Sequence, residues 1–212
     1  MQRTRVKICG ITSLSDALAA EAAGCDAVGF VLWDGSPRCV SIDIVASITR
    51  KLSPMTTTIG VFVSPNAEDV LRVCQHGGLS GAQLCGDLGD DEWTRVADEV
   101  HLIRSIGIMP ECAPRLDEIP GVSDILVDSR SEHSPGGTGQ TFDWSLVCNL
   151  TGETRIWLAG GLHAGNVGEA VRRVRPFAVD VSSGVEERPG VKSHTKIAEF
   201  IAAVLAADHQ TD

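Results

Sequence analysis

Two side chains that could move protons stand at the ends of predicted strands: Cys9 follows "VKI" and Asp128 follows "ILV". A thiolate can accept a proton and a protonated carboxyl group can donate one, so the two residues suit general acid–base catalysis. Each residue also has a simpler interpretation. Cysteine is among the residue types most often buried, and an aspartate in an apolar strand can serve in a structural hydrogen bond. Taken alone, these residues leave both roles open.

Glycine turns follow the last two predicted strands, in "LAGGL" and "VDVSSGVE". Many barrels bind phosphate at these two positions through backbone N–H groups. Each turn by itself is only a tight turn, but their coincidence predicts a phosphate site. Its expected residues are Gly160, Gly161, Ser182, Ser183 and Gly184, and the segment "RPGVKS" could lie beside it.

Further polar residues follow other predicted strands. Arg38 lies in "DGSPRCV" after the second strand, and Gln83 ends the fourth. The segment "HSPGGTGQTFDW" after the sixth strand is either a surface loop or a lid whose backbone approaches a ligand. In the second interpretation the substrate contacts include Gly137, Thr138 and Gly139.

Short β-branched runs occur eight times along the chain, and each is followed by a helical pattern or by a gap of helix size. The expected strands are residues 5–9, 26–33, 56–63, 79–84, 101–108, 124–129, 155–161 and 177–184. Such alternation predicts a parallel sheet, because each return crossover needs a helix. Eight units in 212 residues predict an α/β fold with a single (β/α)8 barrel over residues 1–212. An open doubly wound sheet is the alternative, but no G-x-G-x-x-G follows the first strand.

The barrel prediction places the polar residues relative to one another, because active sites of such barrels form at the carboxyl ends of the strands. Side chains alternate along a strand, so Cys9 shares a face with Lys7, and Ser182 shares one with Asp180. If these faces are interior, Cys9 and Asp128 point toward the mouth. Lys7 and Asp180 then lie one layer deeper and should pair, because interior charges need partners.

Composition excludes several classes of function. The chain is 43% hydrophobic, enough for a sizeable core, and its net charge of −10 argues against binding to nucleic acid or anionic membranes. No apolar run approaches the ~18 residues of a membrane span, and no signal peptide opens the chain. Seven cysteines without CxxC pairs or zinc spacing predict no metal site. They favour a cytoplasmic protein with reduced thiols.

Several segments occur together in one order over almost the whole chain. They are "VKICGIT", "GFV…SPR", "GVFV", "LVDS…GGTGQTFDW", "LAGGL…NV" and "VDVSSGVE…PGVK". With them the sequence resembles the phosphoribosylanthranilate isomerase family of tryptophan biosynthesis. The resemblance implies a barrel without cofactor or metal that converts N-(5′-phosphoribosyl)anthranilate to 1-(2-carboxyphenylamino)-1-deoxyribulose 5-phosphate, an Amadori rearrangement.

The resemblance also implies roles for single residues. Cys9 would be the general base, Asp128 the general acid, and Arg38 the ligand of the anthranilate carboxylate. The base must then be ionised and the acid protonated, and Gly10 would leave room for the sugar beside the thiol. The expected partner is a phosphorylated small molecule, and the chain is expected to be a monomer or a homodimer.

Three positions depart from the family pattern. Cys85 stands where the family often has histidine, Cys39 where an aromatic residue is common, and Ser193 where aspartate is usual. The departures affect the packing around the anthranilate ring and the cap near the phosphate, but no proposed catalytic residue. Cys85 also puts a second oxidisable thiol near the mouth.

Three other functions stay open. One is the same rearrangement of the histidine-pathway substrate, although that family places aspartate at the position of Cys9 and has an internal half-barrel repeat. A second is a phosphate-binding barrel without catalysis. A third is a Schiff-base aldolase using Lys7 or Lys192.

Overall fold

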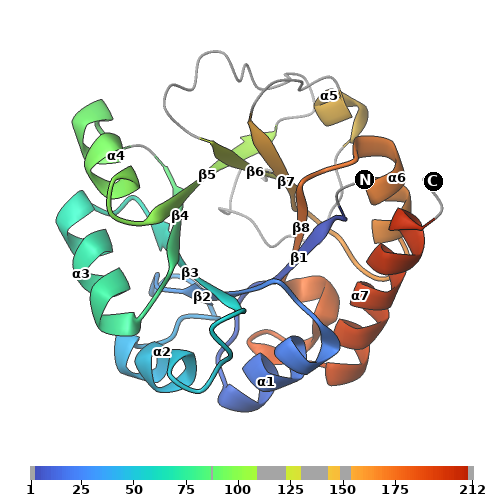
Figure 1. Cartoon of the computed structure of the whole chain (residues 1–212), viewed down its shortest axis with the longest axis horizontal. Helices are drawn as coiled ribbons and strands as arrows, with labels where there is room; N and C mark the ends of the chain where they lie inside the picture. Colours follow the sequence, from blue (N-terminus) through green and yellow to red (C-terminus); the bar gives the residue numbers. More distant parts are fainter. Residues whose placement is uncertain (1–2, 87, 109–122, 130–142, 149–153, 210–212) are drawn as a thin grey trace.

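A closed ring of eight parallel strands forms the centre of the molecule, in the order of the sequence (Figure 1). The computed structural model describes residues 3–86, 88–108, 123–129, 143–148 and 154–209. The strands are β1 (Arg5–Ile8), β2 (Ala27–Val31), β3 (Thr57–Val63), β4 (Gly81–Cys85), β5 (His101–Ile108), β6 (Asp124–Ser129), β7 (Arg155–Leu158) and β8 (Ala178–Val181). Because β1 pairs with both β2 and β8, the sheet closes. The predicted (β/α)8 barrel is confirmed, and the open sheet is excluded.

Helices surround the barrel on the outside (Figure 1). They are α1 (Leu14–Ala23), α2 (Ile42–Thr49), α3 (Ala67–Gly77), α4 (Asp90–Ala97), α5 (Ser145–Cys148), α6 (Val167–Val174) and α7 (His194–Asp208). Side-chain caps fix several helix starts, since the Ser13 hydroxyl and the Asn66 side chain each accept a backbone N–H of the first turn. Gly24 ends α1 in the left-handed conformation with φ 95°, which glycine adopts without steric cost.

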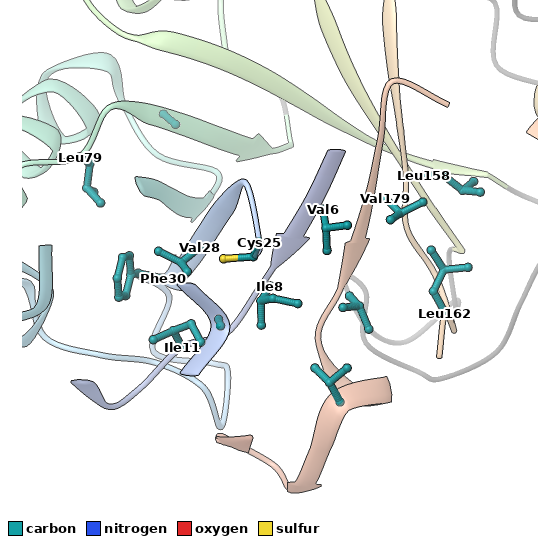
Figure 2. Close-up of a cluster of buried hydrophobic side chains, with 14 of the residues drawn as sticks. Val6, Ile8, Ile11, Cys25, Val28, Phe30, Leu79, Leu158, Leu162 and Val179 are labelled. Atoms are coloured by element: carbon teal, nitrogen blue, oxygen red, sulfur yellow. The ribbon is translucent and has the colours of Figure 1, made fainter. Parts of the chain in front are cut away.

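Apolar regions on the inside and on the outside of the strand ring hold the barrel together. One lies inside it, where Ile59, Ile103, Leu126 and Trp157 pack below the mouth. The larger one lies between strands and helices, and Figure 2 shows part of it. Burying one large aliphatic side chain contributes roughly 1.5–3 kcal/mol. Cys25 belongs to the second region, among Val6, Val28 and Phe30, and burial raises the pKa of its thiol to about 12.

A short hairpin after β8 was not predicted. A single 3-10 turn, η2 (Ser183–Val185), leads into β9 (Glu186–Arg188) and β10 (Val191–Lys192). The hairpin bends at Gly190, whose φ is 79° and whose carbonyl accepts the Thr12 hydroxyl. A β-carbon at Gly190 would lie 3.1 Å from Pro37 O. The hairpin therefore sits against the loops that follow β1 and β2.

The last helix is fixed to the first strand. The Asp208 carboxylate accepts both the backbone N–H and the hydroxyl of Thr4, at 2.9 and 2.7 Å. This contact joins two residues that are 204 positions apart in the sequence.

In the described part of the chain, no helix has the length and apolar character needed to cross a membrane.

Candidate active site

Cys9 follows β1 at the carboxyl end of the barrel and is 7% exposed. Lys7, two residues earlier on the same face, is fully buried in the interior. Its Nζ lies 3.0 Å from Asp180 Oδ1 and donates to Gln83 Oε1 at 2.9 Å. The predicted pairing of Lys7 with Asp180 is confirmed. Gln83, expected at the substrate, is 5% exposed and its side-chain oxygen is occupied by Lys7.

Gly29 on β2 makes room for the two side chains of β1. A β-carbon at Gly29 would lie 2.9 Å from Cys9 Sγ, 3.0 Å from Lys7 Cε and 3.2 Å from Lys7 Nζ. Real β-carbons essentially never come within 3.0 Å of another heavy atom, so a larger residue at Gly29 requires a shift of Cys9. The sulfur of Cys9 and the ammonium of Lys7 thus converge on one point of the barrel wall.

Asp128 lies near the end of β6, with its carboxyl group at the same end of the barrel. Burial, together with the negative charge of Asp180, raises its pKa to about 6. The Ser129 hydroxyl faces Asp128 Oδ1 at 3.4 Å. A carboxyl group with a pKa near neutrality can hold a proton for delivery to a substrate. The raised pKa favours the expected protonated form of Asp128, although the carboxylate still prevails at neutral pH.

The environment of Cys9 is mixed. Burial raises the pKa of its thiol, whereas the Lys7 ammonium lowers it and Asp180 opposes Lys7; Lys192 adds a weaker lowering effect. The net direction is upward, which favours the neutral thiol in the free protein. The expectation of an ionised Cys9 is therefore not met by the ligand-free site, and the two nearby lysines are the groups that favour the thiolate.

Arg38, in the loop after β2, is held by a residue that the sequence did not single out. Its Nε and Nη2 donate to the two carboxylate oxygens of Glu186 on β9, each at 2.8 Å. Lys192 Nζ also contacts Glu186 Oε1 at 2.9 Å and donates to the carbonyl of Ser182 at 3.1 Å. Arg38, Glu186 and Lys192 form a largely buried charge network between the loop after β2 and the hairpin after β8.

The two predicted phosphate turns lie against each other. Gly160 and Gly161 have φ of 86° and 62°, so both adopt the left-handed conformation that favours glycine. A β-carbon at Gly184 would overlap the carbonyl oxygen of Leu162, which shows how closely the turn after β8 approaches the one after β7. Ser182 precedes η2, a short extra helix at the place where barrels bind phosphate.

Four predicted substrate-site residues remain, namely Gly10 and the glycine-loop residues 137–139. Gly137, Thr138 and Gly139 lie outside the described residues. Gly10 has a φ of 73°, and a β-carbon there would meet Arg38 Cδ at 2.7 Å and Ser182 Oγ at 2.9 Å. The space beside Gly10 is thus filled by protein side chains rather than left for the sugar as expected.

The three departures from the family pattern occupy distinct places. Cys85 ends β4, at the end of the barrel where Cys9 follows β1; its thiol is half-buried, and burial raises its pKa. The Cys39 thiol contacts the Asp34 carboxylate at 3.4 Å. Ser193 precedes α7. Among the described residues, no group of three or more His, Cys, Asp and Glu side chains is arranged for a metal ion.

Glu186 and Gly29 were not predicted as site residues, and Lys192 was considered only as a Schiff-base lysine. Glu186 and Lys192 stand inside the quoted segments "VDVSSGVE" and "PGVK", where charged residues next to a glycine turn were the available signal. Gly29 gave no such signal, because its role depends on the position of Cys9 across the strand pair.

The carboxyl ends of the strands carry an acid, a thiol and two glycine turns. Active sites of (β/α)8-barrel enzymes lie at this end, so the chain belongs to that class of enzyme. Residues 6–203 match the family model of N-(5′-phosphoribosyl)anthranilate (PRA) isomerase. The chain belongs to that family.

Individual relatives agree with the family assignment. The chain is 41% identical to the N-(5′-phosphoribosyl)anthranilate isomerase of Chlorobium luteolum, over 96% of this chain and 98% of the relative. It is 43% identical to the isomerase of Pelobacter propionicus, over 93% of each chain. The solved phosphoribosyl anthranilate isomerase of Thermus thermophilus superposes with a TM-score of 0.87 at 35% identity, covering 96% of this chain and 99% of that one.

Proposed function

We propose that this protein catalyses the Amadori rearrangement of N-(5′-phosphoribosyl)anthranilate to 1-(2-carboxyphenylamino)-1-deoxyribulose 5-phosphate in tryptophan biosynthesis. The observation that carries the proposal is the placement of Cys9 and a raised-pKa Asp128 at one end of the barrel. Family membership supplies the substrate class. A related isomerase, at 37% identity and a TM-score of 0.82, was solved with reduced 1-(o-carboxyphenylamino)-1-deoxyribulose 5-phosphate.

The reaction needs one acid and one base. Asp128 delivers a proton to the ribose ring oxygen, the bond from C1′ to that oxygen breaks, and the anilino nitrogen forms a Schiff base. Cys9 then removes the proton from C2′, which gives an enol-amine that tautomerises to the ketone. Each proton transfer by a positioned side chain contributes about 10²–10⁴-fold.

The free site does not hold both groups in the reacting form at once. With a raised pKa at Cys9 and a pKa of about 6 at Asp128, the prevailing form near neutrality is thiol and carboxylate. Transfer of one proton between the two groups gives thiolate and acid without any exchange with solvent, because both forms carry one proton. The reaction therefore proceeds from the less populated form, in which Cys9 is a thiolate and Asp128 carries the proton.

Other residues bind the two ends of the substrate, the anthranilate carboxylate and the phosphate. Arg38 meets the anthranilate carboxylate, because Glu186 engages its Nε and Nη2 and leaves Nη1 for another acceptor. The turns containing Gly160, Gly161, Ser182, Ser183 and Gly184 bind the phosphate through their backbone N–H groups. Gln83 acts indirectly, through Lys7, and residues 137–139 approach the substrate.

We further propose that residues 1–212 form one barrel domain, located in the cytoplasm, that works as a monomer or a homodimer without metal or cofactor. The homodimer is suggested by the isomerase of Thermotoga maritima, which is described as dimeric and is 36% identical over 96% of this chain, with a TM-score of 0.86.

The direct test is an assay of the purified protein with N-(5′-phosphoribosyl)anthranilate, followed by loss of the fluorescence of the anthranilate adduct. Catalytic turnover is the expected result. Turnover of only the histidine-pathway phosphoribosyl substrate, or of neither substrate, would overturn the proposal. Borohydride treatment with substrate is expected to trap no adduct on Lys7 or Lys192.

A further inference from the structure

The interior of the barrel holds a buried ion pair, Lys7 with Asp180, at an N–O distance of 3.0 Å. Lys7 is fully buried and Asp180 is 9% exposed, and the two stand opposite each other on the paired strands β1 and β8. Replacing such a pair by apolar residues is often neutral or stabilising. Its presence directly below the acid and the base therefore calls for a role other than stability.

The pair is oriented toward the two proton-transfer groups. The Lys7 ammonium and the Cys9 sulfur converge on Gly29 of β2, so the positive charge lies beside the thiol. The negative charge projects from β8, and β7 and β6 come next round the ring, where Asp128 stands. Gln83 from β4 accepts from Lys7 on another side and holds the ammonium in place.

We propose that Lys7 and Asp180 are positioning residues whose paired charges favour the reacting proton arrangement, with a thiolate at Cys9 and a carboxylic acid at Asp128. The inference rests on the proposed function and deepens it. One buried pair thus acts on both the base and the acid of the reaction.

The electrostatic directions agree with this arrangement. At Cys9, Lys7 lowers the thiol pKa and outweighs the opposing effect of Asp180. At Asp128, Asp180 raises the carboxyl pKa and outweighs the opposing effect of Lys7. Although burial lowers the pKa of Lys7, the Asp180 carboxylate raises it above its ordinary value, so Lys7 stays charged. The two effects bring the pKa values of the base and the acid closer together.

Other charged and titratable groups also face the pair of reacting residues. They are Lys192 on β10, Arg38 after β2, Cys85 at the end of β4 and the Ser129 hydroxyl beside Asp128. Lys192 and Arg38 share the Glu186 carboxylate, which offsets part of their charge. Lys7 is the cation with the largest effect on Cys9.

The test compares the wild type with the double variant Lys7→Met/Asp180→Asn, which removes both charges and leaves neither one buried alone. The matched control is Asp124→Asn/Arg155→Met, which removes an ion pair at the opposite end of β6 and β7. Thermal unfolding checks that each variant folds. The measurements are the pH profile of kcat/KM and the pH dependence of Cys9 alkylation by iodoacetamide, read from the peptide containing Cys9.

In the double variant the acid limb of the profile should move to lower pH and the alkaline limb to higher pH. The plateau between them should fall about tenfold for each unit by which the two pKa values separate. The midpoint of Cys9 alkylation should rise, and the control should leave both limbs in place. If the plateau falls but both limbs of the pH profile stay in place, the ion pair has only a structural role and the inference is overturned.

The alkylation arm separates this inference from the proposed function. It needs no turnover, so a shifted midpoint in a protein without isomerase activity would support the pairing and reject the function. An unshifted midpoint in an active isomerase would reject the pairing alone. Should Lys7→Met/Asp180→Asn not fold, the single variant Asp180→Asn carries the test. It should lower the acid limb and also the alkylation midpoint.

Discussion

Arg38 and Glu186 form a two-pronged ion pair, with two N–O distances of 2.8 Å, between the loop after β2 and the hairpin after β8. The partners are 148 residues apart in the sequence. A guanidinium held on one edge by a carboxylate keeps a fixed orientation and presents its other donors to a second acceptor. Glu186 therefore orients the residue proposed to bind the carboxylate of the substrate.

The first prediction concerns Glu186→Gln. An amide cannot accept from both donors of Arg38, and Lys192 also loses its counter-charge. The variant therefore leaves a largely buried Arg38 and a buried Lys192 without a carboxylate partner. We expect KM for the substrate to rise more than kcat falls. Breaking a buried pair costs about 3–5 kcal/mol, which corresponds to a loss in Tm on the order of 10 °C. The control Glu187→Gln changes an exposed neighbour and should leave KM and Tm unchanged. An unaltered KM in Glu186→Gln would separate Arg38 from substrate binding.

The second prediction concerns Gly29→Ala. The added methyl group would lie 2.9 Å from Cys9 Sγ and must displace it or Lys7. A misplacement of about 1 Å at a reacting group can cost about a hundredfold in rate, and we expect a fall of this order in kcat with the fold retained. Gly89→Ala is the control, because a β-carbon there meets nothing within 4 Å. Full activity in Gly29→Ala would show that the position of the thiol tolerates change.

The third prediction is the pH profile of the wild type. Below pH of about 6, both Cys9 and Asp128 carry protons and no base is available. As pH rises through about 6 one proton leaves the pair, so kcat/KM should rise to a plateau. It should fall again where the raised pKa of Cys9 is passed, because no acid then remains. A rising limb near the ordinary carboxyl pKa would contradict the burial of Asp128 in the working enzyme.

The fourth prediction concerns Gly184→Ala. Its methyl group would overlap the Leu162 carbonyl, so the turns after β7 and β8 must separate. We expect KM for the substrate and the inhibition constant of inorganic phosphate to rise together, with a smaller change in kcat. Gly168→Ala in α6 adds only ordinary van der Waals contacts and serves as the control. Unchanged phosphate inhibition would place the phosphate elsewhere.

Much of the fold follows from sequence because each unit repeats a simple local pattern. The bounds of β5 and β6 agree with the prediction. The strand β7 was predicted to continue to 161 but ends at Leu158, since Gly160 and Gly161 adopt positive φ. The hairpin of β9 and β10 was missed because strands of three and two residues are too short to show alternation.

Site residues were predictable where two rules determine their position: the alternation of side chains along a strand and the closure of the barrel. Those two rules place Lys7 and Asp180 on neighbouring interior faces, and the pair was foreseen. The contact between Arg38 and Glu186 depends on how two loops fold over the mouth, which no local pattern encodes. The pKa of Cys9 also escaped prediction, because it results from burial acting against two lysines.

The central claim is that Cys9 and Asp128 are the base and the acid of the rearrangement. The most direct measurement is kcat of Cys9→Ala and of Asp128→Asn with N-(5′-phosphoribosyl)anthranilate, from the loss of adduct fluorescence, together with substrate binding by each variant. The account predicts that turnover falls by at least about 10²–10⁴-fold in each variant while substrate still binds. Turnover near that of the wild type in either variant would contradict the role of the residue replaced.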